Sequence, residues 1–339
     1  MQGSTPSGFS RLALGILLLA LALSLVSVHI RLLNAGLGCP EWPDCYGQLS
    51  QVMAAGNGPG AVEPSARAAP PWATVAHRLL ATALALMIPV LAFSVLRQGG
   101  HAPERRRLAL AMLALMVVLA VLGIWSSGLQ LPAVVLANFA GGIALVGLAW
   151  WLYLGTLSPR APPRPPAGAG LRRGVRVATA LLIAQLLLGG LVTAYFAGMA
   201  CGTSITCNGA WPRLPFIELA ALFRPLELDA LGRVVMDDSR AGLLMTHRML
   251  GLTLLPIIAA CAFLAWQSGR WLSAAVLLII VMATILLGVV TIHSELAPGL
   301  ALGHYALALT LLMTLLWLGH DMAHERLRSV GAARVLNPA

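Results

Sequence analysis

Eight apolar stretches constrain the fold of this sequence more than any other feature. They lie at residues 11–31, 74–96, 108–127, 133–155, 176–197, 242–266, 271–291 and 300–319. A helix needs about 20 apolar residues to cross the hydrocarbon core of a membrane, and none of these stretches contains Lys, Asp or Glu. Strands of a membrane barrel would alternate between apolar and polar residues instead. We therefore predict an all-α, polytopic membrane protein with eight transmembrane helices.

The composition excludes several other classes of protein. Hydrophobic residues make up 59% of the chain and charged residues only 10%, against about a quarter charged in a soluble domain. The net charge of +10 could indicate nucleic-acid binding, but the basic residues lie mainly in short loops between apolar stretches. This distribution is a topology signal, so we predict contact with membrane lipid and none with nucleic acid.

The arginine distribution predicts the orientation in the membrane. All 22 basic residues are Arg, and 14 of them, with only 3 of the 12 acidic residues, fall on the side that holds both termini. The positive-inside rule places that side in the cytoplasm, and we expect a bacterial inner membrane. The Pro- and Arg-rich residues 158–176 are predicted to form a flexible cytoplasmic linker. The linker separates residues 1–157 from residues 177–319, and a cytoplasmic tail follows at 320–339.

The two halves repeat each other. Cys39 and Cys45 recur in the second half as Cys201 and Cys207, and the His77-Arg78 pair recurs as His247-Arg248. Pro132 and Asn138 recur as Pro298 and His304. Three recurring pairs in the same order indicate an internal duplication. We expect two four-helix bundles related by a pseudo-two-fold axis normal to the membrane.

Two histidines in the second half are candidate metal ligands. His247 and His304 lie in antiparallel spans and are expected at the same depth near the outer face, where intramembrane histidines are functional candidates. Two imidazoles that face each other across a helical bundle are typical of a b-type haem, whose iron they bind from both sides. The alternative is two unrelated histidines that bond to backbone groups or water.

The first half breaks this pair, because His77 is present but its expected partner is Asn138. An amide is a poor iron ligand. His29 and His293 lie at similar depth and could be propionate partners, spare ligands or solvated interfacial residues. The arginines that follow the two repeated histidines, Arg78 and Arg248, could snorkel to the interface or pair with haem propionates; these two alternatives remain open.

The paired cysteines fall on the oxidising side of the predicted topology. Both pairs have the spacing Cys-x5-Cys, which allows a turn that brings the sulfurs together. We predict the disulfides Cys39–Cys45 and Cys201–Cys207, with zinc bound by four cysteines as the alternative.

Several segments resemble one known family of membrane proteins. Residues 34–47 read NAGLGCPEWPDCYG and look like the first outer loop of the haem A synthase family, whose members oxidise the C8 methyl group of haem O to a formyl group for terminal oxidases. Segments 72–78, 134–142 and 246–248 match as well. The resemblance covers nearly the whole chain. It implies haem b between His247 and His304, and a site for haem O in the first half.

The chain departs from the family pattern in that first half. The family has a glutamate three residues before the span-2 histidine, where this chain has Thr74, and a span-4 histidine, where it has Asn138. Threonine cannot act as a base at neutral pH, so a proton-handling carboxylate is missing. His77 remains as the expected ligand of haem O iron.

The resemblance implies an oxidoreductase, a haem A synthase-type enzyme, as the first hypothesis. A non-catalytic haem-binding paralogue that acts in haem delivery or oxidase assembly is the second. A transporter fits worse, since broken helices and an intramembrane charged site are not visible in the sequence. Expected partners are haem O synthase and the assembly factors of a terminal oxidase, with a homo-oligomer also possible.

Overall fold

A computed structural model describes residues 8–34, 71–97, 103–125, 131–157, 167–210, 213–227, 234–235 and 237–336. Within these ranges there are eight long helices and no β-strand. In the first half they are α1 (Gly8–Asn34), α3 (Pro71–Arg97), α4 (Pro103–Trp125) and α5 (Pro132–Leu154). In the second half they are α6 (Ala169–Ala194), α7 (Asp238–Gln267), α8 (Trp271–His293) and α9 (Pro298–Leu336). Each is long and apolar enough to cross a membrane, which confirms the predicted all-α class with eight transmembrane helices.

Local sequence signals explain where these helices begin. Four of them have proline as their first residue, where the missing N–H costs nothing: Pro71, Pro103, Pro132 and Pro298. At the start of α7, the carboxylate of Asp237 accepts a hydrogen bond from the backbone N–H of Arg240 at 3.2 Å, as a helix N-cap does.

The linker and the tail contain more helix than the sequence analysis expected. Helix α6 begins at Ala169, inside the expected linker 158–176, because no proline follows residue 166 and the arginines there sit at the helix end. Helix α9 continues to Leu336, well past residue 319. Its charged Asp321 and Glu325 are compensated by Arg270, whose side chain is fully buried beside them.

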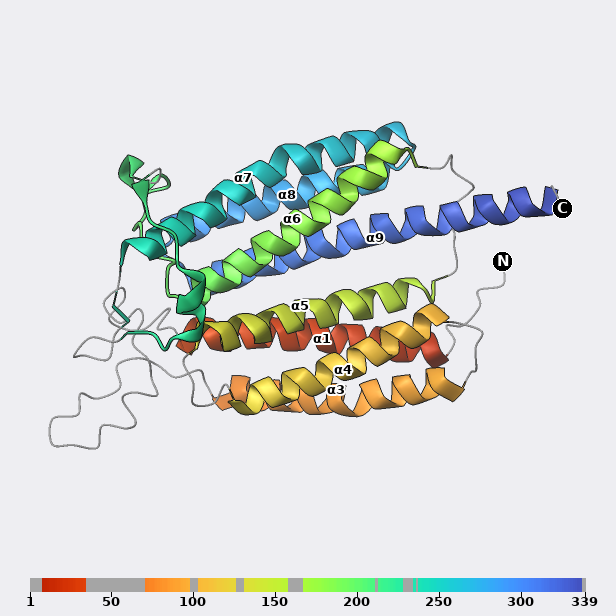
Figure 1. The fold of residues 1–339 in the computed structure, drawn as a ribbon, viewed down its shortest axis with the longest axis horizontal. Coiled ribbons are helices and arrows are strands. Elements are labelled where there is room, and N and C mark those ends of the chain that lie inside the picture. Colours follow the sequence, from red (N-terminus) through yellow and green to blue (C-terminus); the bar gives the residue numbers. More distant parts are fainter. Residues whose placement is uncertain are drawn as a thin grey trace.

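Figure 1 shows the helices in two groups of four, one per half. Helices α1 and α5 of the first half pack against α6 and α9 of the second. Helix α1 starts and α9 ends at one end of the bundle, while the connection between α6 and α7 lies at the other end (Figure 1).

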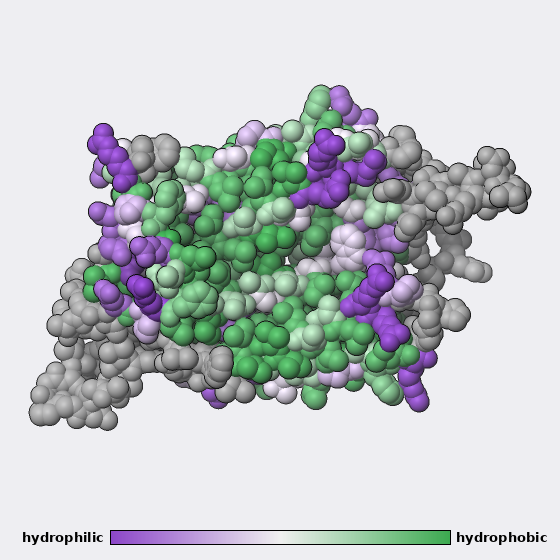
Figure 2. Space-filling model, in the orientation of Figure 1, coloured by the Kyte–Doolittle hydropathy of each residue, from purple (hydrophilic) through white to green (hydrophobic). Residues whose placement is uncertain are grey.

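The surface is that of a multi-pass membrane protein. Figure 2 shows an apolar band around the middle of the molecule, with hydrophilic residues gathered at the two ends. Large side chains in this band are exposed, among them Leu86, Ile279 and Leu286, each with about two thirds of its surface uncovered. Such a belt is stable in lipid and would be an aggregation site in water.

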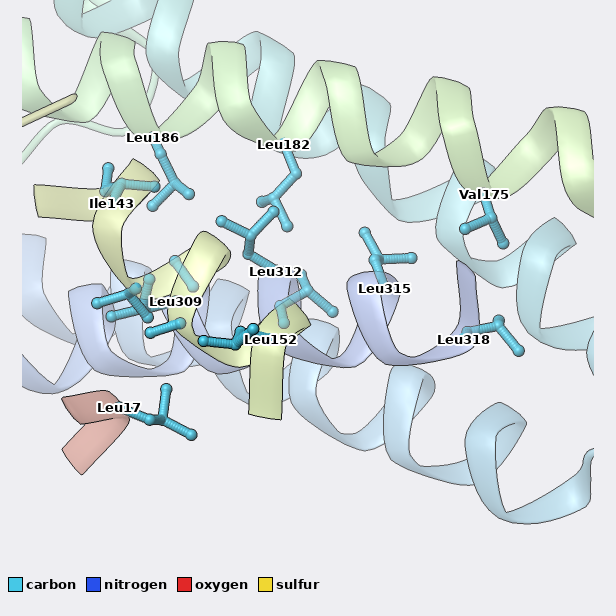
Figure 3. Close-up of a cluster of buried hydrophobic side chains, with 14 of the residues drawn as sticks. Leu17, Ile143, Leu152, Val175, Leu182, Leu186, Leu309, Leu312, Leu315 and Leu318 are labelled. Atoms are coloured by element: carbon cyan, nitrogen blue, oxygen red, sulfur yellow. The ribbon is translucent and has the colours of Figure 1, made fainter. Parts of the chain in front are cut away.

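Leucines fill the space where the halves meet. Figure 3 shows Leu182 and Leu186 of α6 and Leu309 and Leu312 of α9 in one cluster with Ile143 and Leu152 of α5, all of which are buried. The indole N–H of Trp150 on α5 donates to a backbone carbonyl of α9 at 2.8 Å. The two halves therefore share one continuous core.

Candidate functional site

The two histidines of the second half lie next to each other, with the edge of one ring toward the other. The ring centres of His247 on α7 and His304 on α9 are 6.4 Å apart, and their planes are inclined by 72°. Both rings lie toward the end of the bundle where α6 connects to α7. The fold therefore brings the two expected ligands together.

A backbone carbonyl selects the tautomer of His304. Its Nδ1 lies 2.9 Å from the carbonyl oxygen of Thr284 on α8. Because a carbonyl only accepts hydrogen bonds, Nδ1 must carry the proton, and the neutral ring then has a free electron pair on Nε2. Such a bond at the far nitrogen is the usual way a protein orients a metal-binding imidazole.

Helix α6 supports His247. The side-chain amide of Gln185 donates to the backbone carbonyl of His247 at 2.9 Å, and its nitrogen lies 3.4 Å from His247 Nε2. His247 Nδ1 and Gln185 Oε1 are buried without a hydrogen-bond partner in the protein. Buried polar atoms are normally paired, so these two point to a group that the protein chain does not supply.

Two glycines make room for the imidazoles. A Cβ atom at Gly189 on α6 would lie 3.2 Å from Cε1 of His247, and one at Gly288 on α8 would lie 2.9 Å from Cε1 of His304. Any larger residue at Gly288 would therefore push the ring away. The backbone of each supporting helix approaches one ring directly.

Arg248 links the histidine site to the segment between α6 and α7. Its Nη1 donates to the carbonyl oxygens of Ser204 and Ile205 at 2.7 and 2.8 Å, while Nε and Nη2 are buried without a protein partner. Arg78, its counterpart in the first half, is exposed. The remaining donors of Arg248 can bind an anionic group, since a guanidinium is well shaped for a carboxylate, whereas the exposure of Arg78 fits snorkelling.

The loop that Arg248 holds is closed by a disulfide. Cys201 and Cys207 are bonded to each other, with their Cα atoms 4.8 Å apart, which confirms this predicted pair and excludes these two residues as zinc thiolates. Asn208 adopts a left-handed conformation with φ of 55°, which reverses the chain after Cys207. The predicted Cys39–Cys45 pair lies outside the described residues.

The histidine pair is the only strong metal-ligand set around these rings. Within the described ranges, no three His, Cys, Asp or Glu side chains are arranged to hold a metal ion. A two-histidine site therefore suits a metal that brings its other ligands with it. Two metal–nitrogen bonds of about 2 Å each, plus roughly 1 Å from each nitrogen to its ring centre, span about 6 Å, close to the observed separation.

The first half lacks the paired imidazoles of the second half. His77 on α3 and Asn138 on α5 are both half-buried, and Thr74 lies in the first turn of α3. In the second half His247 faces a second imidazole, whereas the position that corresponds to His304 in the first half is Asn138.

The two other outer-end histidines differ from each other. His29 stacks on Trp72 of α3, with ring centres 5.8 Å apart, and its Nδ1 is buried without a protein partner. His293, the last residue of α8, is exposed. The solvated interfacial alternative therefore fits His293, while His29 belongs to the interior of the first half.

Comparison with known proteins identifies the family. Residues 10–316 match the sequence model of the family described as cytochrome oxidase assembly protein. This chain belongs to the cytochrome oxidase assembly protein family. It is also similar to a protein named Heme A synthase from Shewanella oneidensis, at 27% identity over 323 residues, which cover 91% of this chain and 95% of the relative.

Four residues that support the two rings in this family member were not predicted from the sequence: Gln185, Gly189, Thr284 and Gly288. Gln185 could have been found, because a lone amide inside an apolar span is unusual. Gly189, Gly288 and the carbonyl of Thr284 left no such signal, since glycine is common in membrane helices and every residue has a carbonyl group.

Tyr195 was missed as well. It follows directly after α6, and its hydroxyl is buried without a protein partner. Burial raises the pKa of Tyr195, so the phenol stays protonated and can donate a hydrogen bond.

Proposed function

We propose that this member of the cytochrome oxidase assembly protein family is a haem A synthase-type oxidoreductase. It oxidises the C8 methyl group of haem O to a formyl group for a terminal oxidase. The family match and the relative named Heme A synthase support this reaction. The single observation that carries the proposal is the separation of 6.4 Å between the His247 and His304 rings, which suits an iron ion between them.

His247 and His304 hold haem b from both sides in this proposal. The carbonyl of Thr284 keeps the proton on Nδ1 of His304 and leaves Nε2 for the iron. Arg248 offers two buried donors to a propionate. When bound, haem b would supply reversible one-electron transfer, and His247 and His304 would hold its iron and keep water and dioxygen away from it.

The substrate haem O binds in the first half, with His77 as its iron ligand. Conversion of a methyl to a formyl group takes up one oxygen atom at the level of water and releases four protons and four electrons, which the haem b held by His247 and His304 would pass to an external electron acceptor. Asn138 would supply no second imidazole to haem O. Thr74 supplies no carboxylate, so protons must leave by another route, through water or haem propionates.

The proposed topology places both termini in the cytoplasm of a bacterium, with the inner membrane as the site of action. The arginine bias supports this orientation, as does the position of the α1 start and the α9 end at one end of the bundle (Figure 1). The disulfide Cys201–Cys207 lies at the opposite end, which is then the oxidising periplasm. Haem O synthase and oxidase assembly factors are the proposed partners, and a homo-oligomer is compatible with this topology.

A pseudo-two-fold relation between the halves is part of the proposal. Phe139 and Tyr305 correspond, since they follow Asn138 and His304, and each contacts the first helix of the other half: Tyr305 bonds to Ser24 on α1, and Phe139 packs on Gly190 of α6. Phe139 and Tyr305 also pack on each other, with ring centres 5.4 Å apart. Reciprocal contacts of this kind are what a two-fold axis produces.

A second candidate function is a non-catalytic, haem-binding paralogue that acts in haem delivery or oxidase assembly. Thr74 and Asn138, which stand where the family has a glutamate and a histidine, favour it. The two functions share the haem b site and differ only in whether the first half converts haem O.

Pigment analysis of the purified protein, combined with histidine variants, tests the proposal. The wild type should contain haem B with a low-spin spectrum, and cells supplied with haem O should accumulate haem A. His247→Ala and His304→Ala should each abolish the low-spin signal, whereas His293→Ala, at an exposed position, should retain it. A low-spin signal that survives in both ligand variants refutes the site, and pigmented protein without haem A formation favours the paralogue.

A further inference from the structure

The contacts between the halves lie next to the proposed iron ligands. Tyr305 follows His304 on α9, and Phe139 follows Asn138 on α5. The Tyr305 hydroxyl and the Ser24 hydroxyl on α1 are 2.5 Å apart, and both side chains are buried. We call Ser24, Phe139 and Tyr305 the inter-half clasp.

The inter-half clasp contacts α6, which supports the His247 ring, and α9, which carries the His304 ring. On one side, the ring of Phe139 packs on Tyr305. On the other side it fills the space above Gly190, where a Cβ atom would lie 2.6 Å from the ring. Gly190 is adjacent to Gly189, which supports His247. Phe139 therefore touches α6 next to the glycine that supports His247, and it touches α9 next to His304.

We propose that Tyr305, held by Ser24, is a positioning residue that sets the orientation of the His304 imidazole. This inference rests on the proposed haem b site. Elsewhere along α9, the Trp150 indole bonds to the α9 backbone and Arg270 pairs with Asp321 and Glu325 near its far end. A buried hydrogen bond is directional, so the Ser24–Tyr305 bond defines the rotation of α9 one residue from the ligand.

The consequence for the iron is geometric. Rotation of α9 would tilt the His304 ring relative to the His247 ring and would strain the bond from His304 Nδ1 to the carbonyl of Thr284. The angle between the two imidazole planes, 72° in this structure, would then change. The electron paramagnetic resonance signal of low-spin ferric haem depends on that angle, so it reports the positioning role directly, independently of enzyme activity.

The experiment compares four purified holoproteins: wild type, Tyr305→Phe, Ser24→Ala and the double variant. Tyr305→Phe keeps the ring that packs on Phe139 and removes only the hydroxyl. We expect the low-spin signal to shift in the same direction in both single variants, with no further shift in the double variant. Haem retention during detergent exchange should also fall several-fold. Tyr153→Phe is the matched control, since its ring packs on Trp150, toward the other end of α5, and its signal should equal that of the wild type.

The other possible results each contradict a specific part of the proposal. A pigmented wild type with an unchanged signal in Tyr305→Phe overturns the positioning role alone. A shift in Tyr305→Phe that Ser24→Ala does not reproduce overturns it too, because the hydrogen bond is then not the cause. If the Tyr305→Phe protein does not accumulate, the low-spin signal of Ser24→Ala is compared with that of the wild type instead, and an unchanged signal overturns the positioning role. A wild type without low-spin haem overturns the haem b site and this inference together.

Discussion

The guanidinium group of Arg248 donates a hydrogen bond to the carbonyl oxygen of Ser204 at 2.7 Å. Ser204 lies between the two cysteines of the disulfide, and Arg248 directly follows His247. This bond joins the covalently closed outer loop to the helix that carries a proposed iron ligand. The loop is therefore part of the site and not only a connection between α6 and α7.

Replacement of Arg248 by Met should release this loop. The variant loses two bonds from a charged donor to loop carbonyls, and hydrogen bonds to charged groups contribute about 1.5–3 kcal/mol each when buried. Since Arg248 is only half-buried, we expect a loss of about 2 kcal/mol in the free energy of unfolding. Thermal unfolding in detergent measures this loss. Arg78→Met, at the exposed counterpart, should change the stability little, and equal losses in both variants would contradict the role of the loop bonds.

Replacement of Gly288 by Ala should displace the His304 ring. The new Cβ would lie 2.9 Å from Cε1 of that ring, which is too close for a carbon–carbon contact, so the imidazole must move. Haem content per purified protein should fall, and the low-spin spectrum should change. Gly123→Ala is the control, because nothing lies within 4 Å of a Cβ there. Full haem content in Gly288→Ala would show that the ring is not confined as described.

Both cysteine pairs should be oxidised in the native protein. Alkylation before reduction should therefore modify Cys261, the free and buried cysteine among the described residues, only after unfolding, and the four paired cysteines not at all. The chain-entropy model assigns a loop of this length roughly 2–3 kcal/mol, so Cys201→Ser should lower the unfolding temperature. Mass spectrometry of alkylated peptides checks the pairing, and modification of Cys39 or Cys45 without reductant would disprove the pair outside the described residues.

Restoration of the family residues in the first half should raise haem A formation. Thr74→Glu supplies a carboxylate for protons, and Asn138→His supplies the second imidazole. If the native chain is a working synthase, the double variant should convert haem O faster, and His77→Ala should lose conversion. Haem A is measured by pigment extraction from cells supplied with haem O. Equal haem A formation in the wild type and His77→Ala would place the substrate elsewhere.

Much of the site could be predicted because the residues that carry it are rare in apolar sequence. His247 and His304 stand out in spans without Lys, Asp or Glu, and the Cys-x5-Cys repeat marks the same connection in each half. The lengths of the linker and tail were harder to predict, because polar residues at a helix end are compatible with either helix or loop. In the tail, Arg270 decides the outcome by pairing with Asp321 and Glu325.

The sequence by itself determined the number of membrane helices, their order and the two histidines of the second half. These follow from hydrophobic length and residue type, which are properties of the chain alone. Only the tertiary structure decided that Thr284 selects the tautomer of His304, that Gly189 and Gly288 admit the rings, and that Phe139 meets Tyr305 between the halves. These contacts depend on how far each helix is rotated about its axis and shifted along it, and a nearly uniform apolar surface leaves both settings open until the helices pack.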